Sequence, residues 1–112
     1  MSMRILVLGA GGVGGSVVPI AARRSFFEHV VVADYDEGRA TTVVDRIDDP
    51  RFSAARVDAS DAAAVAALCR AERISHVLNA VDPRFVMPIF EGAFAAGADY
   101  LDMAMSLSRP HP

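Results

Sequence analysis

A glycine-rich segment carries the clearest chemical pattern in this sequence. Residues 9–14 read Gly-Ala-Gly-Gly-Val-Gly and follow directly on a run of branched aliphatic residues at positions 5–8. In such a segment Gly9 permits a tight turn, and Gly11 leaves no Cβ between the backbone and an approaching ligand. Gly14 lets a helix pack closely on a strand. The spacing therefore predicts a strand, a glycine turn and a helix that opens at the turn.

The start of that helix is expected to bind a pyrophosphate group. The first N–H groups of a helix have no partner within it, and they carry a partial positive charge. Gly12 and Val13 belong to this first turn, so with the three motif glycines they are candidate contacts for the phosphates of a dinucleotide. The alternative is a glycine-rich turn that binds no ligand.

Asp34 is the second candidate, because it lies twenty residues after Gly14 at the end of a valine-rich run. At this distance an acidic side chain accepts hydrogen bonds from the adenosine ribose. Its charge would repel a 2′-phosphate, which favours NAD as the cofactor. Arg39 could bind such a phosphate, so NADP is retained as the second choice, and Tyr35 is a candidate to flank the adenine. Solvated surface positions are the alternative for all three side chains.

Further candidates follow the later strands, where ligands of open α/β sheets bind. Asp58 would lie near the adenine, whereas Ala80 and Val81 would lead towards the nicotinamide ribose. Helix capping is the alternative for Asp58 and for Asp82. Tyr100 and Asp102 alternate along the fifth strand, where packing on the sheet is expected and contact with substrate is the alternative.

Strands alternate with helices along the chain and position these residues. Apolar runs predict the strands 4–8, 29–33, 53–58, 76–80 and 100–103. Such alternation implies parallel strands joined by right-handed crossovers, with helices on both faces. The predicted fold is α/β, a Rossmann-type doubly wound parallel sheet with strand order 3-2-1-4-5 that stops after the fifth strand.

Helical spacing of apolar residues predicts one helix after each of the first four strands. The expected stripes are Val13, Val17, Ile20 and Ala21 in the first helix, Ala40, Val43, Val44 and Ile47 in the second, Val65, Leu68 and Cys69 in the third, and Val86, Phe90, Ala93, Phe94 and Gly97 in the fourth. Pro19 is expected to bend or shorten the first helix, and Pro88 requires a place in a first turn. Ser60 is the expected N-cap of the third helix.

Composition narrows the classes of function. A chain of 112 residues forms one domain, and no apolar run is long enough to span a membrane. The net charge of −3 is scattered, so no nucleic-acid surface is expected. The single cysteine, Cys69, favours a reducing cytoplasmic location and a core position, and the three histidines lack the spacing of metal ligands. The sequence contains arginine but no lysine, which excludes lysine chemistry within this chain.

The glycine segment and three others together resemble a known family. Segments 5–14, 32–34, 57–61 and 97–102, the last reading Gly-Ala-Asp-Tyr-Leu-Asp, are similar to the N-terminal domain of the saccharopine dehydrogenase family, which includes carboxynorspermidine synthase-like enzymes. The resemblance implies an oxidoreductase of amino acid metabolism that interconverts a secondary amine and an imine by hydride transfer with NAD or NADP. It carries cofactor roles over to Gly9, Gly11, Gly14, Asp34 and Asp58.

The resemblance also implies a division of the chain. Residues 1–105 are expected to form the dinucleotide-binding domain, and residues 106–112 a tail that leads to an absent substrate domain. This piece should bind cofactor without turnover, and its catalytic residues stay unknown. A homodimer through the open edge of the fifth strand, near Met103 and Met105, is a further expectation. The alternative function is a non-catalytic nucleotide-sensing module of the kind that regulates potassium transport.

Overall fold

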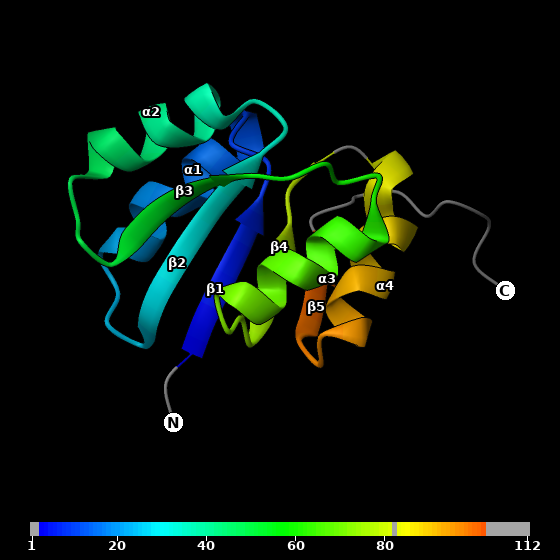
Figure 1. Cartoon of the computed structure of the whole chain (residues 1–112). Coiled ribbons are helices and arrows are strands. Elements are labelled where there is room, and N and C mark those ends of the chain that lie inside the picture. Colours follow the sequence, from blue (N-terminus) through cyan, green and yellow to red (C-terminus); the bar gives the residue numbers. More distant parts are fainter. Residues whose placement is uncertain (1–2, 82, 103–112) are drawn as a thin grey trace, which may run out of the picture.

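A computed structural model describes residues 3–81 and 83–102, in which strands and helices alternate as expected (Figure 1). The elements are β1 (Met3–Leu8), α1 (Gly12–Ala22), β2 (Phe27–Asp34), α2 (Glu37–Ile47), β3 (Phe52–Arg56), α3 (Ala62–Ala71), β4 (His76–Asn79), the short 3₁₀ helix η1 (Pro83–Phe85), α4 (Val86–Ala95) and β5 (Asp99–Asp102). No helix in the described part is long and apolar enough to cross a membrane. Met103, Met105 and the tail 106–112 lie outside the described residues.

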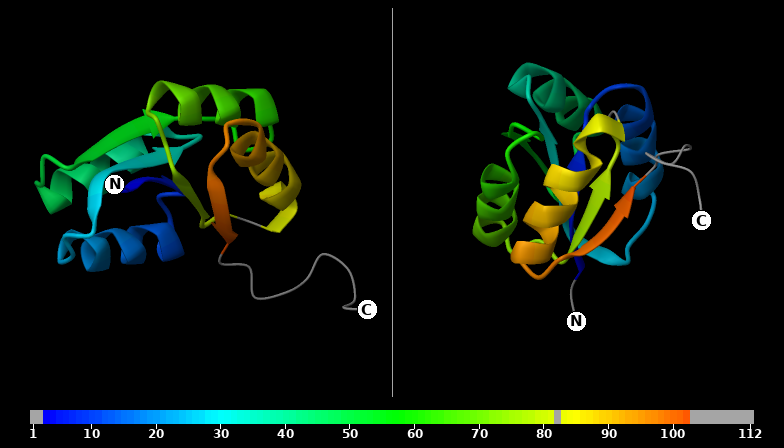
Figure 2. Two further views of the ribbon diagram at one scale, coloured as in Figure 1. Left: turned by 90° about the horizontal axis from the view of Figure 1, so that it is seen from below. Right: turned by 90° about the vertical axis from the view of Figure 1, so that its right-hand side faces the viewer.

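The five strands form one parallel sheet in the order β3-β2-β1-β4-β5, which confirms the predicted topology. Helices cover both faces, as Figure 2 shows. Side chains of α1 and α2 pack on one face and those of α3 and α4 on the other, so the structure has three layers and two apolar cores. The chain leaves β1 in one direction for β2 and later crosses to β4, which places the reversal of strand order beside β1.

The central strands are buried on both faces. Leu6, Val7 and Leu8 are at most 2% exposed, and alternate residues enter opposite cores. Burying each such side chain contributes about 1.5–3 kcal/mol. Because both faces are covered, β1 reads as an unbroken apolar run, and its predicted extent agrees with the structure to within one residue.

The predicted stripe of α1 is wrong at Ile20. Ile20 is 58% exposed, whereas Val18, outside that stripe, is fully buried together with Gly14. The helix is apolar on nearly every side, so spacing alone did not select the face that meets the sheet. The helix also continues for three residues beyond Pro19, with the proline inside it.

The fourth predicted stripe is right at Ala93 and wrong at Phe90 and Phe94. Phe90 and Phe94 are exposed, and Ile89, Gly92 and Ala93 are the buried side of α4. A Cβ on Gly92 would lie 2.7 Å from Val65 Cβ, so this glycine is what lets α4 approach α3. Pro88 does lie in the first turn of α4, as expected.

The third helix begins one residue later than predicted. Asp61, not Ser60, is its N-cap, and the Asp61 carboxylate accepts hydrogen bonds from the amides of Ala63 and Ala64. An aspartate caps at least as well as a serine, and here the Ser60 hydroxyl is already bonded to Asp58. The preceding strand, β3, ends at Arg56 rather than at Asp58.

Candidate functional site

The glycine turn lies at the carboxyl end of β1, between β2 and β4. Gly9 has a φ of +105°, and its amide donates to the carbonyl of Ala33 at 2.8 Å. A Cβ on Gly9 would lie 2.7 Å from Val81 Cγ1 and 3.0 Å from the carbonyl oxygen of Ala80. Both the backbone conformation and the close contact with the loop after β4 therefore require glycine at this position.

Gly14 sets the distance between α1 and β1. It is buried in the first turn of the helix, and a Cβ there would overlap the carbonyl oxygen of Gly9. Gly12 differs, because no atom lies within 4 Å of the place where its Cβ would be. Two of the motif glycines are thus needed for packing, and Gly12 is not.

The start of α1 is open to an anion. Its N-cap, Gly11, offers no side-chain hydrogen bond, and no acidic side chain lies in the first turn. The amides of Gly12, Val13 and Gly14 follow at the positive end of the helix. A cradle without side chains at the end of a helix has the properties that a diphosphate needs.

Asp34 joins the end of β2 to the glycine turn. One carboxylate oxygen accepts from the amide of Ala10 at 2.9 Å, and the other accepts from the amide of Asp36 at 2.9 Å. The backbone carbonyl of Asp34 accepts in turn from the amide of Val57 at 3.1 Å. Each carboxylate oxygen has a second lone pair, so Asp34 can still accept hydrogen bonds from ligand hydroxyls.

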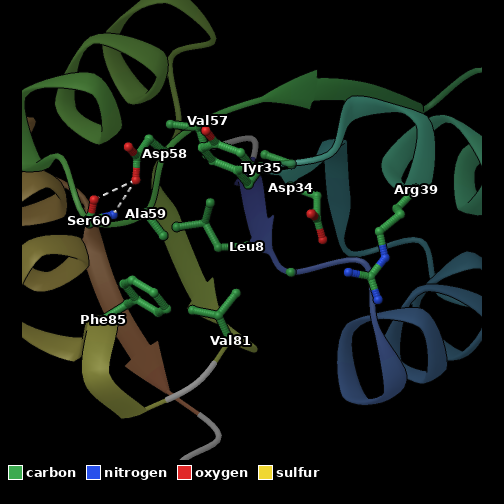
Figure 3. Close-up of a pocket in the computed structure, with 12 residues that line it drawn as sticks. Leu8, Asp34, Tyr35, Arg39, Val57, Asp58, Ala59, Ser60, Val81 and Phe85 are labelled. Carbon is green, nitrogen blue, oxygen red and sulfur yellow. Dashed lines mark hydrogen bonds between the residues drawn. The ribbon is translucent and has the colours of Figure 1, made fainter.

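A cavity of about 390 Å³ extends from Asp34 across the carboxyl ends of β1, β2 and β3 (Figure 3). Five residues expected to bind the cofactor line it: Gly9, Asp34, Tyr35, Asp58 and Val81. Gly11 and Gly12 instead border a neighbouring groove between α1 and α2. The cavity thus brings together side chains from three loops at the edge where the fold binds ligands.

Other lining residues were not predicted from the sequence. They are Leu8, Ala33, Val57, Ala59, Ser60 and Phe85. Leu8 and Val57 each precede a predicted site residue at a strand end, and that neighbour relation could have identified them. Phe85 lies on η1, a short turn with no apolar period to reveal it.

Arg39 extends from α2 towards the glycine turn (Figure 3). Its Nη2 lies 3.6 Å from the position of a Cβ on Gly11. Asp34 and Arg39 therefore border the same cavity with opposite charges. The two side chains that favour different ribose substituents are both at the site, as the sequence indicated.

Tyr35 and Asp58 flank the outer part of the cavity. Tyr35 is 65% exposed, and the Arg56 guanidinium lies 4.6 Å from the centre of its ring. The hydroxyl and amide of Ser60 donate to Asp58 Oδ1, and these hydrogen bonds, with the charge of Arg56, lower the pKa of Asp58. Asp58 is thus an ionised side chain that shapes its own loop and does not cap α3.

The loop after β4 forms the opposite wall. The amide of Ala80 donates to the carbonyl of Leu8 at 2.8 Å, and the amide of Val81 donates to Asn79 Oδ1 at 2.9 Å. Val81 packs on Gly9. The predicted candidates Ala80 and Val81 therefore contact the glycine turn itself, and Asp82 lies outside the described residues.

Cys69 lies in the core, as expected. It is 1% exposed, and burial raises the pKa of its thiol. A thiol that stays protonated in an apolar core is a packing group rather than a nucleophile.

Comparison with solved structures shows the fold. Saccharopine dehydrogenase (L-Glu forming) from Saccharomyces cerevisiae, in its apo form, superposes with a TM-score of 0.80 at 18% identity over 96% of this chain and 23% of its own. A short-chain dehydrogenase/reductase from Burkholderia phymatum in complex with NAD gives 0.68 at 22% identity, over 87% of this chain and 44% of its own. One from Veillonella parvula in complex with NADP gives 0.70 at 11% identity, over 91% and 47%.

This chain spans less than half the length of each of these proteins. The match to a family model identifies the family as well as the fold. Residues 5–111 match the model of the saccharopine dehydrogenase NADP binding domain, and the glycine cradle described above fits the diphosphate of such a cofactor. The chain therefore belongs to the family of saccharopine dehydrogenase NADP-binding domains, whose cofactor is a nicotinamide dinucleotide.

Proposed function

We propose that this chain is the cofactor-binding part of an oxidoreductase that moves a hydride between a nicotinamide and a secondary amine or imine of amino acid type. The observation that carries the proposal is the glycine turn, which opens α1 beside a cavity bordered by Asp34. The family match supports the cofactor class. The substrate class rests on the resemblance of the glycine segment and of residues 97–102 to amine-forming members of that family.

Different residues would contact different parts of the cofactor. The amides at the start of α1, from Gly12 to Gly14, would hold the pyrophosphate. The free lone pairs of Asp34 would accept the adenosine ribose hydroxyls, with Tyr35 and Asp58 on the adenine side. The backbone at Ala80 and Val81 would face the nicotinamide ribose.

Asp34 and Arg39 would decide between the two cofactors. The Asp34 carboxylate borders the ribose position and repels a 2′-phosphate, which favours NAD. Arg39 is exposed and makes no side-chain hydrogen bond or ion pair within the described residues, so it is available to attract that phosphate. We expect NADH to bind more tightly than NADPH, with Arg39 narrowing the difference.

When bound, the nicotinamide supplies the hydride donor or acceptor. The residues of this chain bind and orient the cofactor and shield one side of it. We assign no acid or base here, and we expect this chain alone to bind cofactor without turnover. We place the parent enzyme in the cytoplasm and expect a homodimer.

Calorimetric titration of this chain with NADH and NADPH tests the proposal. Asp34→Ala removes the hydrogen bond to the amide of Ala10, and this loss alone should weaken the binding of both cofactors. For NADH the variant also removes the acceptor of the ribose hydroxyls, whereas for NADPH it removes the repulsion between the carboxylate and the 2′-phosphate. The ratio of the two dissociation constants should therefore change by roughly tenfold in favour of NADPH. Asp45→Ala, on an exposed position of α2 outside the cavity, is the matched control.

Two results would reject the proposal. Folded wild-type protein that binds neither dinucleotide would remove the cofactor role. An unchanged NADH to NADPH ratio in Asp34→Ala would remove the ribose role of Asp34 and leave the carboxylate as a clamp on the turn.

A further inference from the structure

Asn79 is the one buried polar residue among the described residues, and it lies beside the glycine turn. It ends β4 and is 2% exposed. Its side-chain Oδ1 accepts from the amide of Val81 at 2.9 Å, and its Nδ2 donates to the hydroxyl of Tyr100 on β5 at 2.9 Å. The amide is therefore satisfied on both sides, at a depth where an unsatisfied polar group is costly.

The two hydrogen bonds allow one orientation of the Asn79 amide. The backbone N–H of Val81 can only donate, so Oδ1 must face it. This leaves Nδ2 directed towards β5, where the Tyr100 oxygen accepts. The Val81 N–H thus selects the orientation of the amide, and the Tyr100 hydroxyl anchors its Nδ2 end in place.

Tyr100 is itself held in place by packing. It lies on the face of the sheet that meets α3 and α4, and its ring meets that of Phe90 edge to face, with centres 5.5 Å apart. Val77 is its neighbour in register on β4 and points to the same core. The position of the hydroxyl is therefore set by α4 and by two strands.

Val81 transmits this arrangement to the glycine turn. Its Cγ1 occupies the side of Gly9 where a Cβ would otherwise be, at 2.7 Å from that position. Gly9 in turn fixes where the following amides begin α1, and Val81 also lines the cavity next to Asp34. A shift of Val81 would change both the support of the turn and the shape of the cavity.

We infer that Asn79 and Tyr100 are positioning residues for the cofactor site: Tyr100 anchors the Asn79 side chain, which holds Val81 against the glycine turn. This inference rests on the proposed cofactor role, and it adds two residues that make no direct contact with the cavity. Neither residue touches the cofactor in this scheme. Their effect on affinity passes through the backbone of Val81.

Two variants test the inference in the 112-residue chain. Tyr100→Phe keeps the ring and removes the hydroxyl, and Asn79→Leu keeps the approximate volume and removes both hydrogen bonds. We expect the dissociation constant for NADH to rise about threefold to tenfold in Tyr100→Phe and about tenfold or more in Asn79→Leu. Ile74→Ala is the matched control, because it removes packing from the same core at the residue before Ser75 and β4, without touching the register partner of Tyr100 or the Val81 hydrogen bond.

Amide hydrogen exchange of Val81, measured without cofactor, gives a second readout. Exchange at Val81 should accelerate about tenfold in Tyr100→Phe and Asn79→Leu relative to Ile74→Ala at equal global stability. A purely structural role would lower the melting temperature of all three variants and leave NADH affinity unchanged while they are folded. If Asn79→Leu does not fold, Tyr100→Phe alone decides.

The outcomes separate the two proposals. Wild-type protein that binds no dinucleotide rejects the proposed function, and the exchange data still report whether Val81 is held. Wild-type binding with unchanged affinity in both variants overturns the positioning role, whether or not exchange at Val81 has changed. Lower affinity in Ile74→Ala, equal to that of Tyr100→Phe, overturns it as well.

Discussion

Replacing Gly9 with alanine should destabilise the protein, whereas the same change at Gly12 should not. At Gly9 the φ of +105° is unfavourable for any residue with a Cβ, which costs about 1–3 kcal/mol. The new Cβ would lie 2.7 Å from Val81 Cγ1, and relieving such an overlap costs about 1–3 kcal/mol more. Alanine also makes the unfolded chain less flexible, which offsets about 0.4–1 kcal/mol of this loss.

The net loss at Gly9 is then about 1–5 kcal/mol, out of a total stability of about 5–15 kcal/mol for an ordinary domain. At Gly12 the backbone is helical and no atom lies within 4 Å of the new Cβ. Only the effect on the unfolded chain remains, and stability should rise by up to about 1 kcal/mol.

Urea denaturation followed by circular dichroism measures both free energies of unfolding. The two variants share a motif, a chemistry and a method, so each controls the other. Equal changes at Gly9 and Gly12, or a Gly9→Ala protein within about 0.5 kcal/mol of wild type, would refute the assignment of the turn.

Four further outcomes are expected. Gly11→Ala should weaken NADH binding about tenfold with little change in melting temperature. The new Cβ would meet only Arg39 Nη2, at 3.6 Å, within the protein, but it would occupy the space through which the pyrophosphate approaches. Equal affinities of wild type and variant in calorimetry would contradict this. Arg51→Met should lower the melting temperature more than Arg46→Met, because the Arg51 guanidinium donates to two carbonyls at the end of α1; scanning calorimetry compares them. Hydrogen bonds from Arg51 lower the pKa of Asp49 in the folded protein below its ordinary value of 3.8. The stability that this interaction contributes is complete above the ordinary pKa and is lost as the pH falls towards the lower pKa of the folded state. The decline in urea midpoint from pH 5 to pH 3 should therefore be smaller in Asp49→Asn. Phe94→Ser, at a side chain 76% exposed, should reduce self-association in light scattering without lowering stability, and an unchanged average mass would argue against this surface as a contact.

The sheet was predictable because its central strands are buried on both faces. An unbroken run such as 5–8 leaves no polar face for water, and the alternation with helices then restricts the order of strands to a few choices. The buried faces of the helices were harder to predict. In α1 and α4 nearly every side is apolar, so the exposure of Ile20 and Phe94 depends on where Gly14 and Gly92 permit close packing.

The site was predictable where a residue's role follows from its place on a strand end. Gly9 and Asp34 are of this kind, since both spacing and element boundaries identify them. The clamp between Asp34 and the amide of Ala10 was not, because it depends on the relative position of two loops. The bond between Asn79 and Tyr100 was hidden for the same reason, since it joins residues 21 positions apart across two strands.

The position of β1 has a consequence during synthesis. Among the strands of this sheet β1 is synthesised before the others, yet one of its two sheet neighbours, β4, lies 71 residues further along, at Ile5 opposite His76. Until β4 is made, one edge of β1 has no strand to pair with, and an apolar nascent chain in that state attracts other chains. Val81, which packs on Gly9, is added later still, so we expect the glycine turn to reach its final packing only when most of the domain has been translated.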